Sequence, residues 1–163
     1  MQKAFTLIEL LVVTGIIILL SALVLPNYRT GESQLALQRS ANKLAQDIRR
    51  AQEMAMSAKE FEGVVPPGGY GINFQTNLTS YILFADLNNN KVFDSGEAIE
   101  TLSLERGVKI SNLSPASPLT ISFTPPDPTV NINPSNSLAI ITLSNNGQTK
   151  IIKVNKAGLI YVE

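Results

Sequence analysis

The chain has 163 residues, in which 13 Lys and Arg balance 13 Asp and Glu, and it contains neither Cys nor His. This balance provides no global field that would steer the protein toward nucleic acid or anionic lipid. The missing residue types exclude disulfides and thiolate metal sites, and remove the commonest general base. The sequence also contains no phosphate-binding loop, dinucleotide fingerprint or catalytic triad, so we expect neither an enzyme nor a small-molecule substrate.

The first predicted element is an apolar helix over residues 5–25, in which Glu9 is the only charged residue. At 1.5 Å per residue this run is about 30 Å long, the hydrocarbon thickness of a bilayer. An ionisable group in such a segment costs up to roughly 3 kcal/mol at the bilayer centre, so Glu9 needs an explanation. A secretory signal peptide, with Lys3 followed by Ser21 and Ala22, and a plain membrane anchor both fit the length. Neither explains Glu9.

A cut between Ala4 and Phe5 would give Glu9 a role. Phe5 would then carry a free amine, with Glu9 one helical turn away on the same face. A carboxylate there complements the helix dipole, and in hydrocarbon it needs an ionic partner. If such helices pack side by side, Glu9 of one chain can neutralise the N-terminus of its neighbour and fix the register of assembly.

The stretch "AFTLIELLVVTGIIILLSALVLP" resembles the class III signal of type IV pilins and type II secretion pseudopilins. The resemblance implies that residues 1–4 form a leader, that a prepilin peptidase cuts between Ala4 and Phe5, and that Phe5 is then N-methylated. It also implies that Glu9 is the assembly residue and Pro26 the helix break. Ala4 departs from the family, which usually has Gly before the cut.

The same resemblance implies a location and partners. The subunit would cross the inner (cytoplasmic) membrane once, with its globular domain outside the cytoplasm, and would later enter a cell-surface or periplasmic filament. Its partners would be the peptidase, other pilin or pseudopilin subunits and the membrane.

Residues 26–60 are predicted to continue the stem as an amphipathic helix. Apolar side chains recur at spacings of three and four, which predicts one buried stripe. Its members are Leu37, Ala41, Leu44, Ile48, Ala51, Ala55 and Ala58. Charged residues fall mostly off this stripe and indicate a solvated face or a partner surface. Pro26 and Gly31 predict a kink or a locally melted stretch between the two helical parts.

Residues 61–163 are predicted to form a β-rich globular domain. Short alternating runs, separated by Gly, Pro, Asn and Asp, indicate strands. They cover 70–74, 80–85, 98–104, 108–110, 119–123, 138–144, 150–155 and 158–163. Asn146-Gly147 suits a tight primed hairpin turn, and the Pro-rich residues 114–136 are predicted to form an exposed excursion around one strand. A long helix followed by an antiparallel sheet that buries its stripe gives an α+β fold.

Four globular pieces, "LAQDIRRAQEMAMSAK", "GGYGINF", "ILFADLNNNKVFDSGEAI" and "KVNKAGLIYV", resemble minor pseudopilins of the H type and FimT-like pilins. This resemblance implies a structural subunit of a secretion filament or a pilus. DNA uptake is an alternative within the pilus branch. However, the tail offers phosphates only Lys150, Lys153 and Lys156, and strand alternation puts the first two on opposite faces. Nucleic-acid binding is therefore not expected.

The segment "DLNNNKVFDSGE", residues 86–97, has oxygen donors at the spacing of an EF-hand-type loop. The candidate Ca²⁺ ligands are Asp86, Asn88, Asn90, the Val92 carbonyl, Asp94 and Glu97. Against this, Lys91 stands where the loop usually has Gly, and the flanking segments indicate strands. A polar hairpin loop without metal is the simpler interpretation; a calcium-binding tethered or secreted domain is the alternative.

Overall fold

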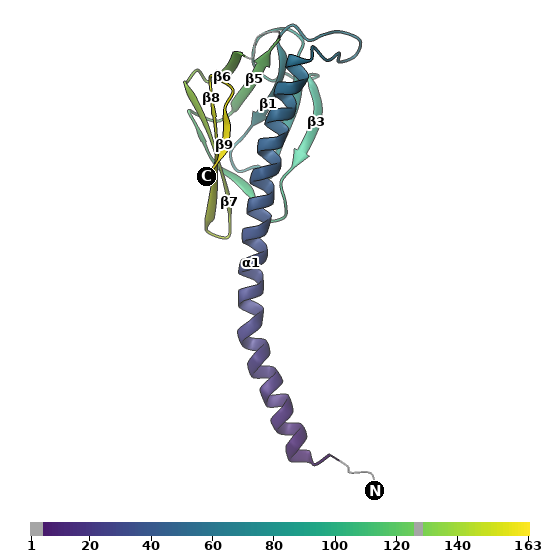
Figure 1. Ribbon diagram of the computed structural model, residues 1–163, viewed down its shortest axis with the longest axis vertical. Helices are drawn as coiled ribbons and strands as arrows, with labels where there is room; N and C mark the ends of the chain where they lie inside the picture. The colour runs from purple at the N-terminus through teal and green to yellow at the C-terminus, as the bar shows by residue number, and fades with distance from the viewer. Residues whose placement is uncertain (1–4, 126–128) are drawn as a thin grey trace.

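The computed structural model describes residues 5–125 and 129–163, without the side chains of residues 24–30 and Thr129. One helix, α1 (Leu7–Met56), leads into a globular body of antiparallel strands (Figure 1). The strands are β1 (Gly69–Phe74), β2 (Ser80–Asp86), β3 (Ala98–Ser103), β4 (Lys109–Ser114), β5 (Leu119–Thr124), β6 (Thr129–Asn133), β7 (Leu138–Asn145), β8 (Gln148–Asn155) and β9 (Ile160–Val162). The predicted α+β class is confirmed.

The backbone of α1 is helical through Pro26 and Gly31, so the predicted melted stretch is not present. Proline removes one backbone donor and can bend a helix, but the helix continues on both sides of it. The helix ends at Met56, earlier than the predicted residue 60. Ser57 is the C-cap, and Ala58 follows in the left-handed region with φ 46°.

The strands form two sheets rather than the single predicted sheet. The first has the order β3-β2-β1-β5-β6, and the second has the order β4-β7-β8-β9. The chain passes from an edge of the first sheet to an edge of the second through residues 104–108, where Gly107 has φ 85°. The run at 129–133, predicted only as part of the excursion, is strand β6 and pairs with β5.

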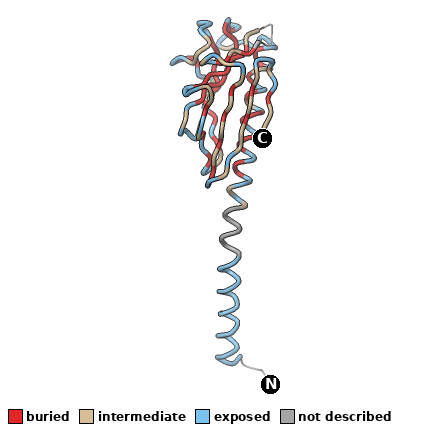
Figure 2. Tube along the Cα trace, turned by 90° about the vertical axis from the view of Figure 1, so that its left-hand side faces the viewer, coloured by how far each residue is buried: buried red, intermediate tan, exposed pale blue. Residues whose placement is uncertain are grey.

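The apolar stripe of α1 lies against both sheets. The helix contacts β1 and β5 of the first sheet, and β7, β8 and β9 of the second. Ala41, Leu44, Ile48 and Ala51 are fully buried in one continuous core, which Figure 2 shows in red along the upper helix. Each buried Leu or Ile contributes about 1.5–3 kcal/mol relative to an exposed one. The predicted stripe is confirmed as far as Ala55; Ala58 lies beyond the helix and is exposed.

The β7–β8 hairpin extends toward the stem beside α1 (Figure 1). Its turn residues Asn146 and Gly147 have φ of 48° and 81°, which is the predicted primed turn. The preceding Asn145 donates from Nδ2 to the Ser33 carbonyl at 3.1 Å and so ties the hairpin to the helix.

Tyr81 provides a test of the helix–sheet contact. It is 1% exposed, and its hydroxyl donates to Asp47 Oδ2 at 2.6 Å. Tyr81→Phe keeps the ring and removes this bond, so we expect the free energy of unfolding at pH 7 to fall by about 1–2 kcal/mol.

The same residue predicts a pH dependence. Burial, and then Asp47, raises the pKa of Tyr81, so the native state holds this proton more tightly than the unfolded chain. The resulting stability is fully present below about pH 10 and is lost as the pH rises further. Urea unfolding at pH 7 and pH 11 should show a smaller drop for Tyr81→Phe than for the parent protein. An equal drop would contradict this assignment.

Candidate functional site

Glu9 caps the start of the helix. Its Oε2 accepts from the Thr6 backbone N–H at 3.0 Å and from the Thr6 hydroxyl at 2.9 Å, while the Thr6 hydroxyl accepts from the Glu9 N–H at 3.3 Å. This is a capping box, which the spacing Thr6 to Glu9 could have predicted. Among residues 5–125 and 129–163, no donor reaches the second oxygen, Oε1. The carboxylate therefore stabilises its own helix with one oxygen and presents the other outward.

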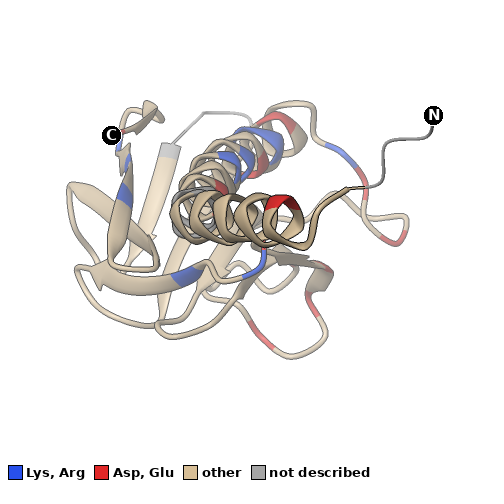
Figure 3. Ribbon diagram, turned by 90° about the horizontal axis from the view of Figure 1, so that it is seen from below, with Lys and Arg blue, Asp and Glu red and all other residues tan. Residues whose placement is uncertain are grey.

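The helix from residue 7 to 23, here called the stem, extends away from the globular body and is exposed on all sides. Its large side chains are 52–83% exposed on all sides, and Phe5 before it is 84% exposed (Figure 2). Seen along its axis in Figure 3, the near part of the helix is uncharged apart from one acidic position near its start. Its hydroxyls bond back to the helix, Thr14 to the Leu10 carbonyl at 2.9 Å and Ser21 to the Ile17 carbonyl at 2.8 Å. These two hydroxyls therefore need no water as a hydrogen-bond partner.

Two sequence predictions lie outside the described residues. They are the leader, residues 1–4, and the Ala4 side of the predicted cleavage site. Within the described part of the chain, no helical segment combines the length and the hydropathy of a membrane span.

The charged face of upper α1 contacts the edge of the first sheet. Arg39 pairs with Glu105 at 2.8 Å, Arg50 pairs with Glu100 at 3.0 Å, and Lys43 Nζ donates to the Ser103 carbonyl at 3.2 Å. Both ion pairs are largely exposed and contribute little to stability. The Lys43 bond occupies one backbone carbonyl at the free edge of β3.

The candidate calcium loop, residues 86–97, is held by its own donors. Asp86 is fully buried and accepts from the N–H groups of Asn90 and Lys91 at 3.1 and 2.9 Å. Glu97, 5% exposed, accepts from the N–H groups of Leu87 and Asp94, both at 3.0 Å.

The other predicted ligands gather around Asp94. Asn88 and Asn90 donate to Asp94 Oδ2 at 2.8 and 2.6 Å, and Asn90 Oδ1 accepts from the Val92 N–H. The described residues contain no group of three or more acidic side chains placed to hold a metal ion.

Lys91 is the cation of this loop. Its Nζ donates to the Gly68 carbonyl, Asn89 Oδ1 and Thr124 Oγ1 at 3.2, 2.5 and 3.0 Å, and lies 4.0 Å from Asp86 Oδ2. The position that departs from the EF-hand pattern thus fastens the loop to β1 and β5. The sequence pattern showed that Lys91 stands at the usual Gly position, but it did not predict these hydrogen bonds.

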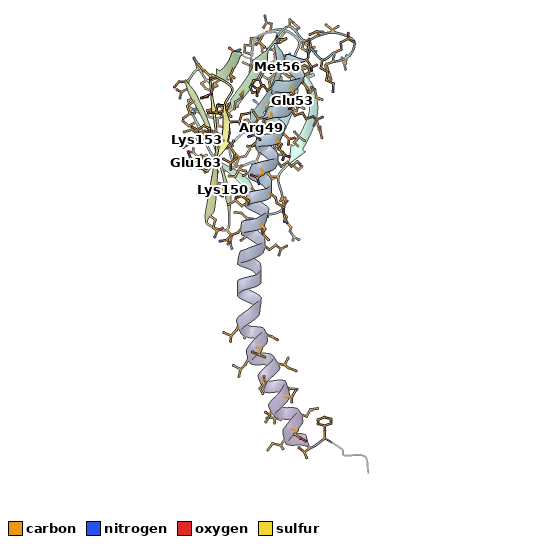
Figure 4. The ribbon with its side chains drawn as sticks, viewed as in Figure 1. Arg49, Glu53, Met56, Lys150, Lys153 and Glu163 are labelled. Atoms are coloured by element: carbon orange, nitrogen blue, oxygen red, sulfur yellow. The ribbon has the colours of Figure 1, made fainter. Side chains whose placement is uncertain are left out.

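The C-terminal lysines do not share a surface. Lys153 pairs with Glu163 at 2.6 Å and lies 5.7 Å from the ring centroid of Tyr161 (Figure 4). Lys150 instead lines a groove beside α1. A continuous phosphate-binding patch would need both on one face.

The described residues thus combine an exposed apolar stem with a two-sheet α+β body. The family model for type II transport protein GspH matches residues 40–158. The chain belongs to this family, and the resemblance to pilins and pseudopilins is thereby confirmed. No solved structure matches the chain.

Among curated proteins, the chain is similar to the pilin-like protein PilA1 of Thermus thermophilus. The two are 34% identical over 96 residues, which cover 59% of this chain and 56% of the relative. The match thus spans little more than half of the relative's length.

The loop geometry predicts that Lys91 is structural. Lys91→Met removes three hydrogen bonds and leaves Asp86 without its nearby cation, at an expected cost of about 1–3 kcal/mol in the free energy of unfolding. Lys156→Met, at an exposed turn, is the matched control and should cost less than about 0.5 kcal/mol.

For the unmodified protein, the melting temperature should be the same in millimolar CaCl₂ and in chelator. A calcium-dependent rise would instead favour the metal-binding alternative.

Proposed function

We propose that this protein is a structural subunit of a type II secretion filament or type IV pilus, made as a membrane-anchored precursor. The bare stem carries this proposal. Burial of each exposed Leu or Ile would stabilise the protein by about 1.5–3 kcal/mol. Such a helix therefore requires lipid or other helices around it. A filament subunit uses both environments in turn. Membership in the GspH family supports the same conclusion.

In this proposal a prepilin peptidase cuts between Ala4 and Phe5 and the new amine of Phe5 is methylated. The precursor crosses the inner membrane once through residues 5–25, with residues 61–163 outside the cytoplasm. An assembly machine then transfers it to a periplasmic or cell-surface filament. Catalysis and small-molecule binding have no part in this function.

Glu9 serves docking in the filament. One carboxylate oxygen caps the helix of its own chain, and Oε1 is free to accept a neighbour's N-terminal ammonium. In apolar surroundings an unpaired carboxylate is costly, so the arrangement in which each Glu9 finds an amine is favoured strongly. The contact fixes axial register, while the apolar helix surface supplies adhesion.

The two branches of the function predict different abundance. A minor pseudopilin, as in the H-type group, would prime a short filament and would not polymerise alone. A major pilin would form long fibres composed mostly of this chain. The name of the matched family points to type II transport, whereas the Thermus relative is called pilin-like.

Processing can be tested by intact mass. The full chain is expressed in membranes with and without a prepilin peptidase. We expect loss of residues 1–4 and the gain of one methyl group on Phe5 only when the peptidase is present. Ala4→Gly should, if anything, be processed faster. A cut beyond Ser21 would mean an ordinary secreted domain. An uncut chain would mean a plain anchor or, if Ala4→Gly is cut, an Ala4 leader that the peptidase rejects.

Docking can be separated from capping by two variants. Glu9→Ala should still be cleaved and remain in membranes, yet its amount in sheared filaments should fall at least tenfold. Thr6→Ala removes the cap and keeps the carboxylate, so its helix loses about 1 kcal/mol while filament entry continues. Quantitative immunoblots of sheared and membrane fractions measure both. Equal incorporation of the two variants would refute the docking role of Glu9.

A further inference from the structure

We propose that a rigid turn at the far end of the globular body docks into a groove near the stem of a second copy of this chain. The inference rests on the major-pilin branch of the proposed function and adds a contact between globular bodies to it. The turn, residues 59–65, is called the finger. The groove lies between α1 and the β7–β8 hairpin.

The finger is a preorganised structure. Phe61 and Val64 exchange backbone hydrogen bonds of 2.9 and 3.1 Å across Glu62 and Gly63, whose φ values are 52° and 80°. A non-glycine residue at positive φ, such as Glu62, is strained and worth a functional explanation. Phe61 packs against the core, and the Tyr70 hydroxyl donates to the Lys59 carbonyl at 2.5 Å. The finger would therefore lose little conformational freedom on docking.

The tip of the finger presents apolar and acidic groups. Val64 and Val65 are 58% and 40% exposed on successive residues, and Glu60 and Glu62 are exposed beside them. Two adjacent exposed valines on a fixed turn form a small apolar knob. With Lys59, the finger has a net charge of −1 at neutral pH.

The groove offers matching chemistry. It has a volume of about 760 Å³, and Leu35 on its helix side is 59% exposed. Gln38 from α1 and Gln148 and Thr149 from the hairpin add uncharged polar groups. Among the residues whose side chains are described, Lys150 is the one charged group that lines the groove. Val64 and Val65 can cover Leu35, while Glu60 or Glu62 approaches the Lys150 ammonium. The Lys150 ammonium favours the acidic finger over a basic partner.

The two surfaces cannot meet within one chain. The part of α1 from Leu35 to Met56 spans about 32 Å, and the finger lies beyond the end of the helix. Figure 4 shows Met56 at the far end of α1 and Lys150 toward the stem. In Figure 1 the finger and the hairpin project to opposite sides of the helix. A contact between different surfaces displaced along an axis does not close on itself and generates an open helical array.

The chain contains no cysteine, so crosslinking can test the contact cleanly. The full chain with Val64→Cys and Leu35→Cys is assembled in cells with the peptidase and the other subunits, and the sheared filaments are oxidised. We expect a ladder of disulfide-linked dimers and higher multimers on non-reducing gels. The control combines Val64→Cys with Thr101→Cys, another exposed position, and should give at least tenfold less dimer.

A charge exchange tests the same contact without cysteines. Glu62→Lys should lower the yield of sheared filaments about fivefold, and adding Lys150→Glu to the same chain should restore it. Filaments that form normally, with no 64–35 crosslink above the control, would overturn the finger contact and leave the filament function intact. If the unmodified chain never enters filaments, the proposed function itself fails. A crosslink from residue 64 to a different subunit would also overturn docking on a second copy.

Discussion

The fold depends on one apolar stripe of α1. The two sheets share no strand pairing in the described residues, and each turns its buried face toward the helix. Leu44 and Ile48 are completely buried at this junction, where side chains of both sheets converge in one core. Without the helix, each sheet would expose an apolar face to water, at a cost that a body of this size could not meet from strand pairing alone. The helix is therefore the element that joins the sheets into one body.

The same helix continues beyond the core, and this continuity links fold to function. Its 50 residues span about 75 Å as one element. The upper part is fixed by the core, by the Asn145–Ser33 bond and by side chains reaching to β3, whereas the stem has no contacts of its own beyond the helix in the described residues. Wherever neighbouring stems pack, they also set the height of each globular body. Register chosen at the base of the helix is thus transmitted to surfaces that lie far from it.

Sequence patterns predicted the elements better than their assembly. Alternation located most strands because half-buried strands show it directly, and Asn146-Gly147 specified its turn through two positive φ values. Strand β6 was not predicted because Pro125 and Pro134 flank a short run with two Asn in five residues, which also suits a loop. The division into two sheets could not be read from alternation, since a period of two says nothing about which strands pair. In loop 86–97 the spacing identified the candidate oxygen ligands correctly. It could not show that these oxygens are already paired with backbone N–H groups of the loop and with Lys91.

In the proposed filament, the chemistry of the stem makes Glu9 the residue that sets the register. Thr14 and Ser21 bond to carbonyls of their own helix, so their partners stay the same in lipid and in a helix bundle. Apolar side chains gain similar dispersion energy from lipid tails and from neighbouring helices, so they do not specify one axial register. Glu9 differs because its capping bonds occupy only one oxygen. Stems can pack with a neighbour's cation near Glu9 or without one. Of all stem groups, the Glu9 carboxylate has the largest difference in free energy between these two arrangements. A single charge in an otherwise uniform surface therefore distinguishes one axial position from all others.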